Sequence, residues 1–221
     1  VNGGWEAQPS GVWFHTWGST EHNEDVYAAA LYYGFTAKAA QIRSFLDTVA
    51  WDNTNNRFLG GRADTRDPMD VNAWGVSALG PSGAHPYGSA LDYVLTHHRS
   101  TQGGIDAFDF NSDRNDIWFE GTGQMVVAFR EAGRTSEASY YLGQLIKGQQ
   151  ANGGVPYSLL GTNNGYWTMT AANAVSSASW LIFADAGFNP LKLATGVAAQ
   201  APPAVPPAPS AGPATSAYNW L

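Results

Sequence analysis

Four glycines recur at nearly regular intervals along this chain, and each closes a segment with helical hydrophobic periodicity. They are Gly34, Gly80, Gly133 and Gly187, separated by 46, 53 and 54 residues. A period of this length is typical of a repeated supersecondary unit and is too long for one helix, so each unit holds two helices. Paired glycines indicate turns between the segments, at 3–4, 60–61, 103–104 and 153–154.

The repeat predicts two sets of helices. The first set, whose members end at the four glycines, is expected at 20–33, 68–79, 117–132 and 171–186. The second set is expected at 36–50, 86–99 and 135–149. In the first helix, Val26, Ala29, Ala30 and Tyr33 follow the spacing i, i+3, i+4, i+7 of one helical face.

Capping signals accompany these helices. Asp67-Pro68 places an N-cap acid before a proline at the first helical position, which predicts a helix start there. The closing glycines are expected to supply the left-handed residue that commonly ends a helix.

The distribution of charge separates the two sets. The first carries almost no Lys or Arg and is rich in Ala, Gly and Ser, whereas the second carries charged residues. Small residues let helices approach closely, so we expect the first set to be the inner one. The sequence therefore predicts an all-α fold, a partial (α/α) toroid of three to four helical hairpins. An open α-solenoid is the alternative, and an all-β sandwich is disfavoured because alternating strands are missing.

The repeat ends after Gly187, and this divides the chain. We expect the toroid over 1–193, a Pro/Ala-rich linker or tail over 194–217, and an apolar terminal tag over 218–221. Three to four hairpins form only part of a ring. We therefore expect missing N-terminal hairpins, self-association, or a partner chain that completes the ring.

Composition excludes several classes of function. The net charge is −7 and only 13% of residues are charged, so the basic cluster that binds nucleic acid is not expected. No apolar run predicts a membrane span, and the lack of cysteine excludes disulfides and thiolate metal sites. Nine Trp, ten Tyr and ten Phe favour carbohydrate, because aromatic rings offer flat apolar faces to sugar rings.

Three segments carry a resemblance to a known family. Residues 19–25 (STEHNED), 70–75 (DVNAWG) and 118–124 (WFEGTGQ) resemble the starts of inner helices in bacterial six-hairpin glycosidase-like (α/α) toroids. The resemblance extends over roughly 3–190. It implies a polysaccharide substrate, acidic residues at the N-termini of the inner helices and, with these, a secreted, extracellular protein.

Four carboxylic acids are candidates for catalysis. Glu21 and Asp25 are four residues apart and share one helix face, while Asp70 and Glu120 belong to the first turns of the next two inner helices. If the helices pack as expected, these acids converge at one end of the ring. Glycoside hydrolysis needs two such groups, one protonated and one ionised. The alternative is structural, because the helix dipole favours acids in a first turn without any catalysis.

Aromatic residues and one histidine near these acids are expected to bind the substrate. They are Trp17, His22, Trp74, Trp118, Tyr157, Tyr166 and Trp167. A His/Tyr pair would also serve a polysaccharide lyase, which abstracts the proton beside a uronic carboxylate. That reaction requires a cation, for which Arg62, Arg66 and Arg114 are available.

One of the four acids, Glu120, also belongs to a pattern with the spacing of a calcium-binding loop. Asp109, Asn111, Asp113, Asn115 and Glu120 occupy positions 1, 3, 5, 7 and 12 of such a loop, all with oxygen donors. The glycine of position 6 is replaced by arginine and no helix precedes the loop. An Asx-rich turn that caps the next helix explains the same residues. No cofactor is required by the leading hypothesis, and Ca²⁺ is the only metal the sequence suggests.

The leading hypothesis is a glycoside hydrolase-like protein that acts on an extracellular polysaccharide by carboxylate acid/base catalysis. The first alternative is a non-catalytic carbohydrate-binding or extracellular surface-assembly subunit. The second alternative is the polysaccharide lyase.

Overall fold

Helices account for most of the ordered structure, as the repeat predicts. The computed structural model describes residues 5–14, 16–64 and 66–193. The expected tail and terminal tag, 194–217 and 218–221, lie outside the described residues. In this part of the chain the helices are α1 (Thr20–Tyr32), α2 (Thr36–Phe45), α3 (Asp70–Leu79), α4 (Ser89–His97), α5 (Phe119–Glu131), α6 (Thr135–Lys147) and α7 (Val175–Ala186). A π-helical turn, η1 (Leu46–Ala50), extends α2.

Short antiparallel strand pairs accompany the helices, and the sequence analysis did not predict them. The pairs are β1 (Trp5–Gln8) with β2 (Gly11–Phe14), β3 (Gly18–Ser19) with β6 (Gly61–Arg62), β4 (Trp51–Asp52) with β5 (Arg57–Phe58), and β7 (Arg99–Gln102) with β8 (Ile105–Phe108). Gly103 and Gly104 form the two-residue turn between β7 and β8, and both have positive φ, as a type I′ turn requires. The paired glycines there are therefore a hairpin turn.

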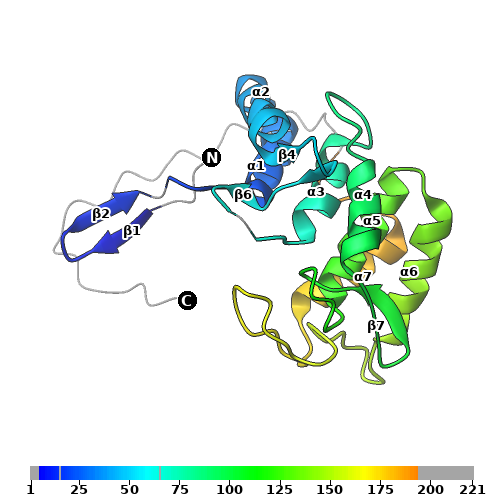
Figure 1. The fold of residues 1–221 in the computed structure, drawn as a ribbon. Helices are drawn as coiled ribbons and strands as arrows, with labels where there is room; N and C mark the ends of the chain where they lie inside the picture. Colours follow the sequence, from blue (N-terminus) through cyan, green and yellow to red (C-terminus); the bar gives the residue numbers. More distant parts are fainter. Residues whose placement is uncertain (1–4, 15, 65, 194–221) are drawn as a thin grey trace.

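The helices that end in glycine pack in the order α1, α3, α5, α7 (Figure 1). Helix α2 packs on α1, α4 on α3, and α6 on α5. The two middle helices of the row, α3 and α5, are the most buried. Of their residues, 8 of 10 in α3 and 10 of 13 in α5 are buried. Only 3 of 9 residues are buried in α4 and 4 of 13 in α6. In these four helices, the members of the first set are thus more buried than those of the second set.

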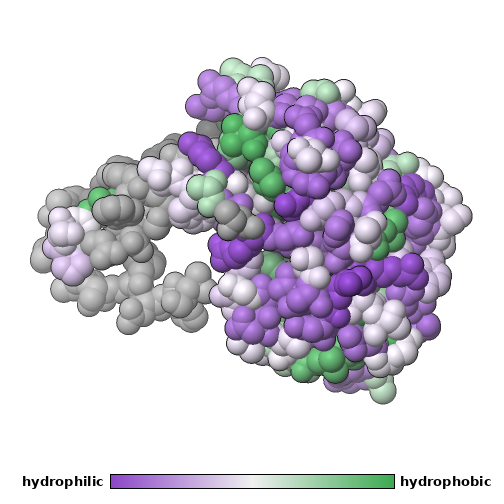
Figure 2. Space-filling model, in the orientation of Figure 1, coloured by the Kyte–Doolittle hydropathy of each residue, from purple (hydrophilic) through white to green (hydrophobic). Residues whose placement is uncertain are grey.

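The two end helices of the row are less buried than the sequence analysis expected. Each of α1 and α7 buries only four residues. Phe35, after α1, is 60% exposed, and Val175 and Ile182 of α7 are 85% and 64% exposed. A hollow of about 540 Å³ lies between α1 and α2, and apolar surface gathers over these helices in Figure 2. Both ends of the row therefore present apolar faces.

The closing glycines have the positive φ that the sequence analysis predicted, but Gly80 after α3, with φ 84° and ψ 173°, does not have the left-handed helical conformation. The residues that close α1, α5 and α7, Gly34, Gly133 and Gly187, have φ between 66° and 74°. Within α5, a Cβ on Gly123 would lie 2.8 Å from the Cβ of Trp180, so glycine lets α5 and α7 approach closely.

No helix in the described residues is both long and apolar enough to cross a membrane.

Candidate functional site

The N-terminus of α1 is held by the strand pair β3–β6. Gly18 pairs with Arg62 and Ser19 with Gly61, and the backbone N–H of Thr20 donates to the carbonyl of Gly60 at 3.0 Å. The side chain of Ser19 caps the helix by accepting from the backbone N–H of His22 at 3.2 Å. These contacts fix the first turn of α1 against the loop that leads to α3.

The start of α3 differs from the sequence prediction. The helix begins at Asp70 instead of residue 68, and no side chain caps it. Asp67 is not its cap. Its carboxylate forms an ion pair with Arg57, accepts from the hydroxyl of Tyr93 at 2.9 Å, and lies 3.4 Å from Nε2 of the buried His98. These partners satisfy Asp67, and its pKa is lowered by His98, Arg57 and Tyr93 despite its burial.

Backbone hydrogen bonds also position the N-termini of α3 and α5. The N–H of Met69 donates to the carbonyl of Phe110 at 2.8 Å, next to the start of α3. The N–H of Phe119, the first residue of α5, donates to the carbonyl of Tyr157 at 3.2 Å. Because these bonds tie the helix N-termini to neighbouring loops, the acids of successive first turns are held close together.

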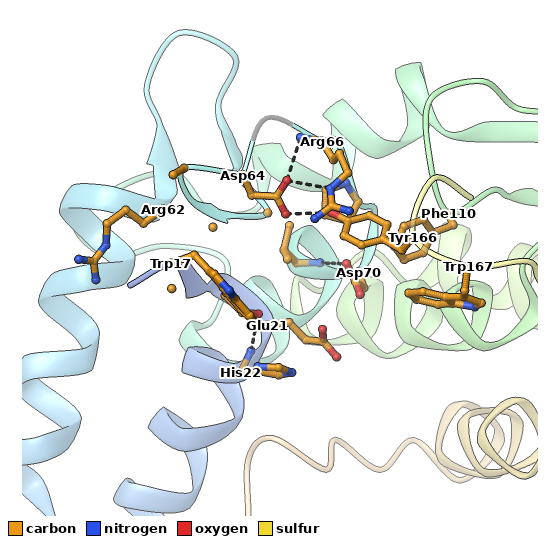
Figure 3. A pocket seen from close by; sticks show the side chains of 17 residues that line it. Trp17, Glu21, His22, Arg62, Asp64, Arg66, Asp70, Phe110, Tyr166 and Trp167 are labelled. Atoms are coloured by element: carbon orange, nitrogen blue, oxygen red, sulfur yellow. Dashed lines mark hydrogen bonds and ion pairs between the residues drawn. The ribbon is translucent and has the colours of Figure 1, made fainter. Parts of the chain in front are cut away.

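A pocket of about 460 Å³ lies beside the starts of α1 and α3 (Figure 3). Its volume is in the range of small-ligand sites. The predicted site residues that line it are Trp17, Glu21, His22, Asp70, Tyr166 and Trp167. Arg62, Asp64, Arg66 and Phe110 also line it. The structure thus combines acids from α1 and α3 with aromatic rings from loops about a hundred residues apart.

Burial is the largest cause of a raised pKa for all four predicted acids. Asp70 has a pKa well above its ordinary 3.8, and the charges of Glu21 and Glu120 raise it further. The pKa of Asp25 rises to about 6, through burial first and the charge of Glu21 second. The pKa values of Glu21 and Glu120 are raised as well, that of Glu120 partly by Glu21. The four acids therefore form one electrostatic cluster around Glu21.

A fifth acid belongs to this cluster and was missed by the sequence analysis. Glu24 is fully buried, and neither carboxyl oxygen has a hydrogen-bond partner within the described residues. A Cβ on Gly75 would lie 2.8 Å from Oε1 of Glu24, so this carboxyl group lies against the backbone of α3. Burial, followed by the charges of Asp70, Glu21 and Asp25, raises its pKa well above 4.5. The signal in the sequence was its spacing, three residues after Glu21.

The predicted sugar-binding aromatic residues fall into two groups. Trp17 and Trp167 are 43% and 44% exposed and present their rings to the pocket. Trp118 is only 3% exposed, and Trp74 packs against the core. Tyr157 is half-buried, and its ring centroid lies 6.3 Å from that of Trp118. Burial and the charge of Glu120 raise the pKa of Tyr157 to about 12.

The arginines needed for a lyase are engaged by other groups. Nε of Arg66 donates to Asp64 at 3.1 Å, and its guanidinium group stacks 3.4 Å from the ring centroid of Tyr166. The guanidinium group of Arg62 lies 5.8 Å from the ring centroid of Phe45. Both arginines that line the pocket are therefore in contact with protein groups.

The loop with calcium-like spacing is organised by hydrogen bonds. The carboxylate of Asp109 accepts from the backbone N–H groups of Phe110 and Asp116, and that of Asp113 accepts from Asn115. Glu120 belongs to the acid cluster instead. In the described ranges, no three His, Asp or Glu side chains gather closely enough to hold a metal ion. The arrangement gives the calcium site no support, and it stays a prediction.

Asp116, in the same loop, is a structural residue that the sequence analysis did not identify. It is fully buried, and its carboxylate accepts from the backbone N–H groups of Leu160, Gly161 and Thr162 at 2.8, 3.0 and 3.2 Å. It therefore anchors the segment that leads to Tyr166 and Trp167 at the pocket.

Comparison with known proteins shows a fold shared with glycosidases. No family model matches the sequence, and no curated protein matches it. Among solved structures, a glycosidase variant with a glutamate replaced by alanine superposes with a TM-score of 0.59 at 13% identity. A second such glycosidase variant, in complex with glucose, has a TM-score of 0.59 at 12% identity. Each match covers 76% of this chain and 51% of the other, so the chain spans about half the length of these glycosidases, and its described residues adopt a mainly helical, glycosidase-like fold.

Proposed function

We propose that this protein hydrolyses glycosidic bonds of an extracellular polysaccharide, in the pocket between the starts of α1 and α3. The observation that carries the proposal is the joint lining of one pocket by two carboxyl groups, Glu21 and Asp70, and two exposed indole rings, Trp17 and Trp167. Aromatic faces bind sugar rings, and paired carboxyl groups perform glycoside hydrolysis.

Glu21 and Asp70 suit different roles, whereas the third carboxyl group of the pocket, that of Asp64, is paired with Arg66. Asp70 is only 7% exposed and has a strongly raised pKa, so it is the proposed general acid. Burial also raises the pKa of Glu21, but less strongly than that of Asp70, and the charge of His22 partly opposes the rise, so the more exposed Glu21 is the proposed ionised partner. Glu120 would act on Asp70 through its charge.

The fold supports a finer proposal about the assembly. We propose that the hairpins form part of an (α/α) toroid, completed by further hairpins or by another chain. The support is the succession of inner helices α1, α3, α5 and α7 with apolar faces at both ends of the row. A secreted location is proposed together with the polysaccharide substrate.

The test is hydrolysis by Asp70→Asn and Glu21→Gln against a panel of neutral and acidic polysaccharides. We expect each substitution to lower the release of reducing ends by about 10²- to 10⁴-fold while the protein stays folded. Asp185→Asn, on the exposed end of α7, is the charge-matched control and should keep full activity. Activity in the two pocket variants equal to that of the control would refute the catalytic assignment.

The same assay distinguishes the two alternatives. A lyase would produce unsaturated sugars that absorb near 235 nm, with a loss of signal in variants of His22 or Tyr157. The non-catalytic alternative would use the exposed indole rings of the pocket to bind sugar without the chemistry. It predicts sugar binding without reducing ends, unchanged in Asp70→Asn and lost in Trp17→Ala.

A further inference from the structure

We propose that a second, smaller cavity next to the pocket is a separate sugar-binding subsite, which holds the neighbouring unit of a neutral oligosaccharide. The cavity has a volume of about 220 Å³. Arg66, Phe110 and Tyr166 line both the pocket and this cavity, so the two spaces lie on opposite sides of one wall. The inference rests on the proposed function, because it concerns the same substrate.

The wall between the two spaces consists of side chains from distant loops. The guanidinium group of Arg66 stacks on Tyr166, whose hydroxyl donates to Oδ2 of Asp64 at 2.9 Å. Arg66 in turn donates to Oδ1 of Asp64 at 3.1 Å. These groups meet at the upper right of the pocket in Figure 3. Because rotation of side chains is enough to part such a wall, a chain of sugars could pass from the pocket into the cavity without movement of the helices.

Asn164 points to the kind of ligand. It is only 4% exposed and lines the cavity, and its Nδ2 is buried with no hydrogen-bond partner among the described residues. Its Oδ1 is occupied by the backbone N–H groups of Tyr166 and Trp167, both at 2.9 Å. A buried N–H group without a partner is costly, and it is satisfied by an acceptor. The free donor therefore fits a hydroxyl group and not a cation.

The rest of the lining completes a sugar site. Phe110 and Tyr166 supply aromatic rings, and Asn111, Ser112 and Asp113 supply groups that exchange hydrogen bonds with hydroxyls. Of the charged groups in the lining, Arg66 is paired with Asp64 and Asp67 with Arg57, which leaves the carboxylate of Asp113 to disfavour an anionic sugar by charge repulsion. The cavity is smaller than typical sites for whole ligands of about 300–1,000 Å³, so it suits a single ring.

The experiment compares how affinity depends on the length of the sugar. The probes are glucose and linear gluco-oligosaccharides of two to five units, in α-1,4, β-1,3 and β-1,4 linkage, with binding measured by calorimetry. The variant is Asn164→Asp, which keeps the Oδ1 acceptor for Tyr166 and Trp167 and replaces the Nδ2 donor by a carboxylate oxygen, with a change of charge. Asn163→Asp makes the same charge change at the exposed neighbouring position, outside both spaces.

We expect wild-type affinity to rise from glucose to the longer sugars, and Asn164→Asp to weaken the longer sugars by about 3- to 10-fold, the effect of one hydrogen bond. Glucose binding should change by less than twofold, and Asn163→Asp should behave as wild type. Equal affinity for all lengths, or an equal effect of both substitutions, would overturn the subsite.

Two further outcomes separate this inference from the proposed function. If the length dependence is present but Glu21→Gln and Asp70→Asn do not affect hydrolysis, the proposed chemistry fails and the subsite stands as part of a binding site. If the wild-type protein binds none of the sugars, the subsite is refuted together with sugar recognition by the pocket. A length dependence that requires added Ca²⁺ and is lost in Asp113→Asn would assign the cavity to a cation and overturn the inference.

Discussion

Replacement of Asp25 by asparagine should stabilise the protein at neutral pH, although it removes a candidate functional acid. The pKa of Asp25 is raised from 3.8 to about 6, mainly by burial and then by the charge of Glu21. Between these two values the folded state binds more protons than the unfolded state, so the free energy of unfolding falls as pH rises. Above pH 6 the whole cost of the charged carboxylate is present. A neutral amide at this position avoids that cost.

The magnitude follows from the same two values. At about 1.4 kcal/mol per pH unit, the interval from 3.8 to about 6 corresponds to about 3 kcal/mol. Asp25 is only partly buried, so solvent screening reduces this to about 1–2 kcal/mol.

The assay is urea denaturation of wild type and Asp25→Asn at pH 3.5 and pH 7.5. The variant should have the higher free energy of unfolding at pH 7.5, whereas the difference should nearly vanish at pH 3.5, where Asp25 is mostly protonated in both states. Asp185→Asn is the control and should stay within about 0.5 kcal/mol of wild type at both values. A variant less stable than wild type at pH 7.5 would refute the electrostatic argument for the cluster.

Two other predictions concern the loop and the ends of the helix row. Asp116→Asn should lower the free energy of unfolding by about 2–4 kcal/mol in urea denaturation, because an amide group would face the N–H groups of residues 160–162. Asp113→Asn, in an exposed turn, should change it by less than about 1 kcal/mol, and equal losses would contradict the anchoring role. Ile182→Glu should abolish any self-association seen by sedimentation velocity, because it charges the exposed face of α7. A wild type that stays monomeric at high concentration would exclude assembly of copies through this face.

The helices were predictable because their signals are local. Hydrophobic periodicity and closing glycines located all seven helices to within a few residues. The start of α3 was predicted two residues too early, because Asp67 has a local capping pattern but distant partners. Arg57, Tyr93 and His98 are 10 to 31 residues away in sequence. Contacts between residues far apart in sequence override local propensity, and they cannot be predicted from a short stretch of sequence.

The site was predictable to the extent that it follows the repeat. Glu21, Asp70 and Glu120 were chosen as candidates because each belongs to the start of a helix of the first set, and the structure places them in one electrostatic cluster. The aromatic residues were harder, because a sequence does not tell a core indole from an exposed one. Trp118 is buried whereas Trp167, in the loop after α6, is exposed. This difference in burial follows from tertiary packing, which a sequence pattern does not show.

Glu24 gives a reason to regard the acid cluster as functional rather than as a set of helix caps. Caps lie in the first turn, where the helix dipole stabilises the charge and lowers the pKa of an acid. Glu24 lies beyond that turn, is fully buried and has no hydrogen-bond partner among the described residues. Burial and three neighbouring acids raise its pKa, so the position opposes folding above the ordinary pKa of a glutamate. Helix capping does not account for an acid that destabilises the fold, and acids with pKa values shifted by burial and by neighbouring charges are concentrated at functional sites, which favours the proposed function.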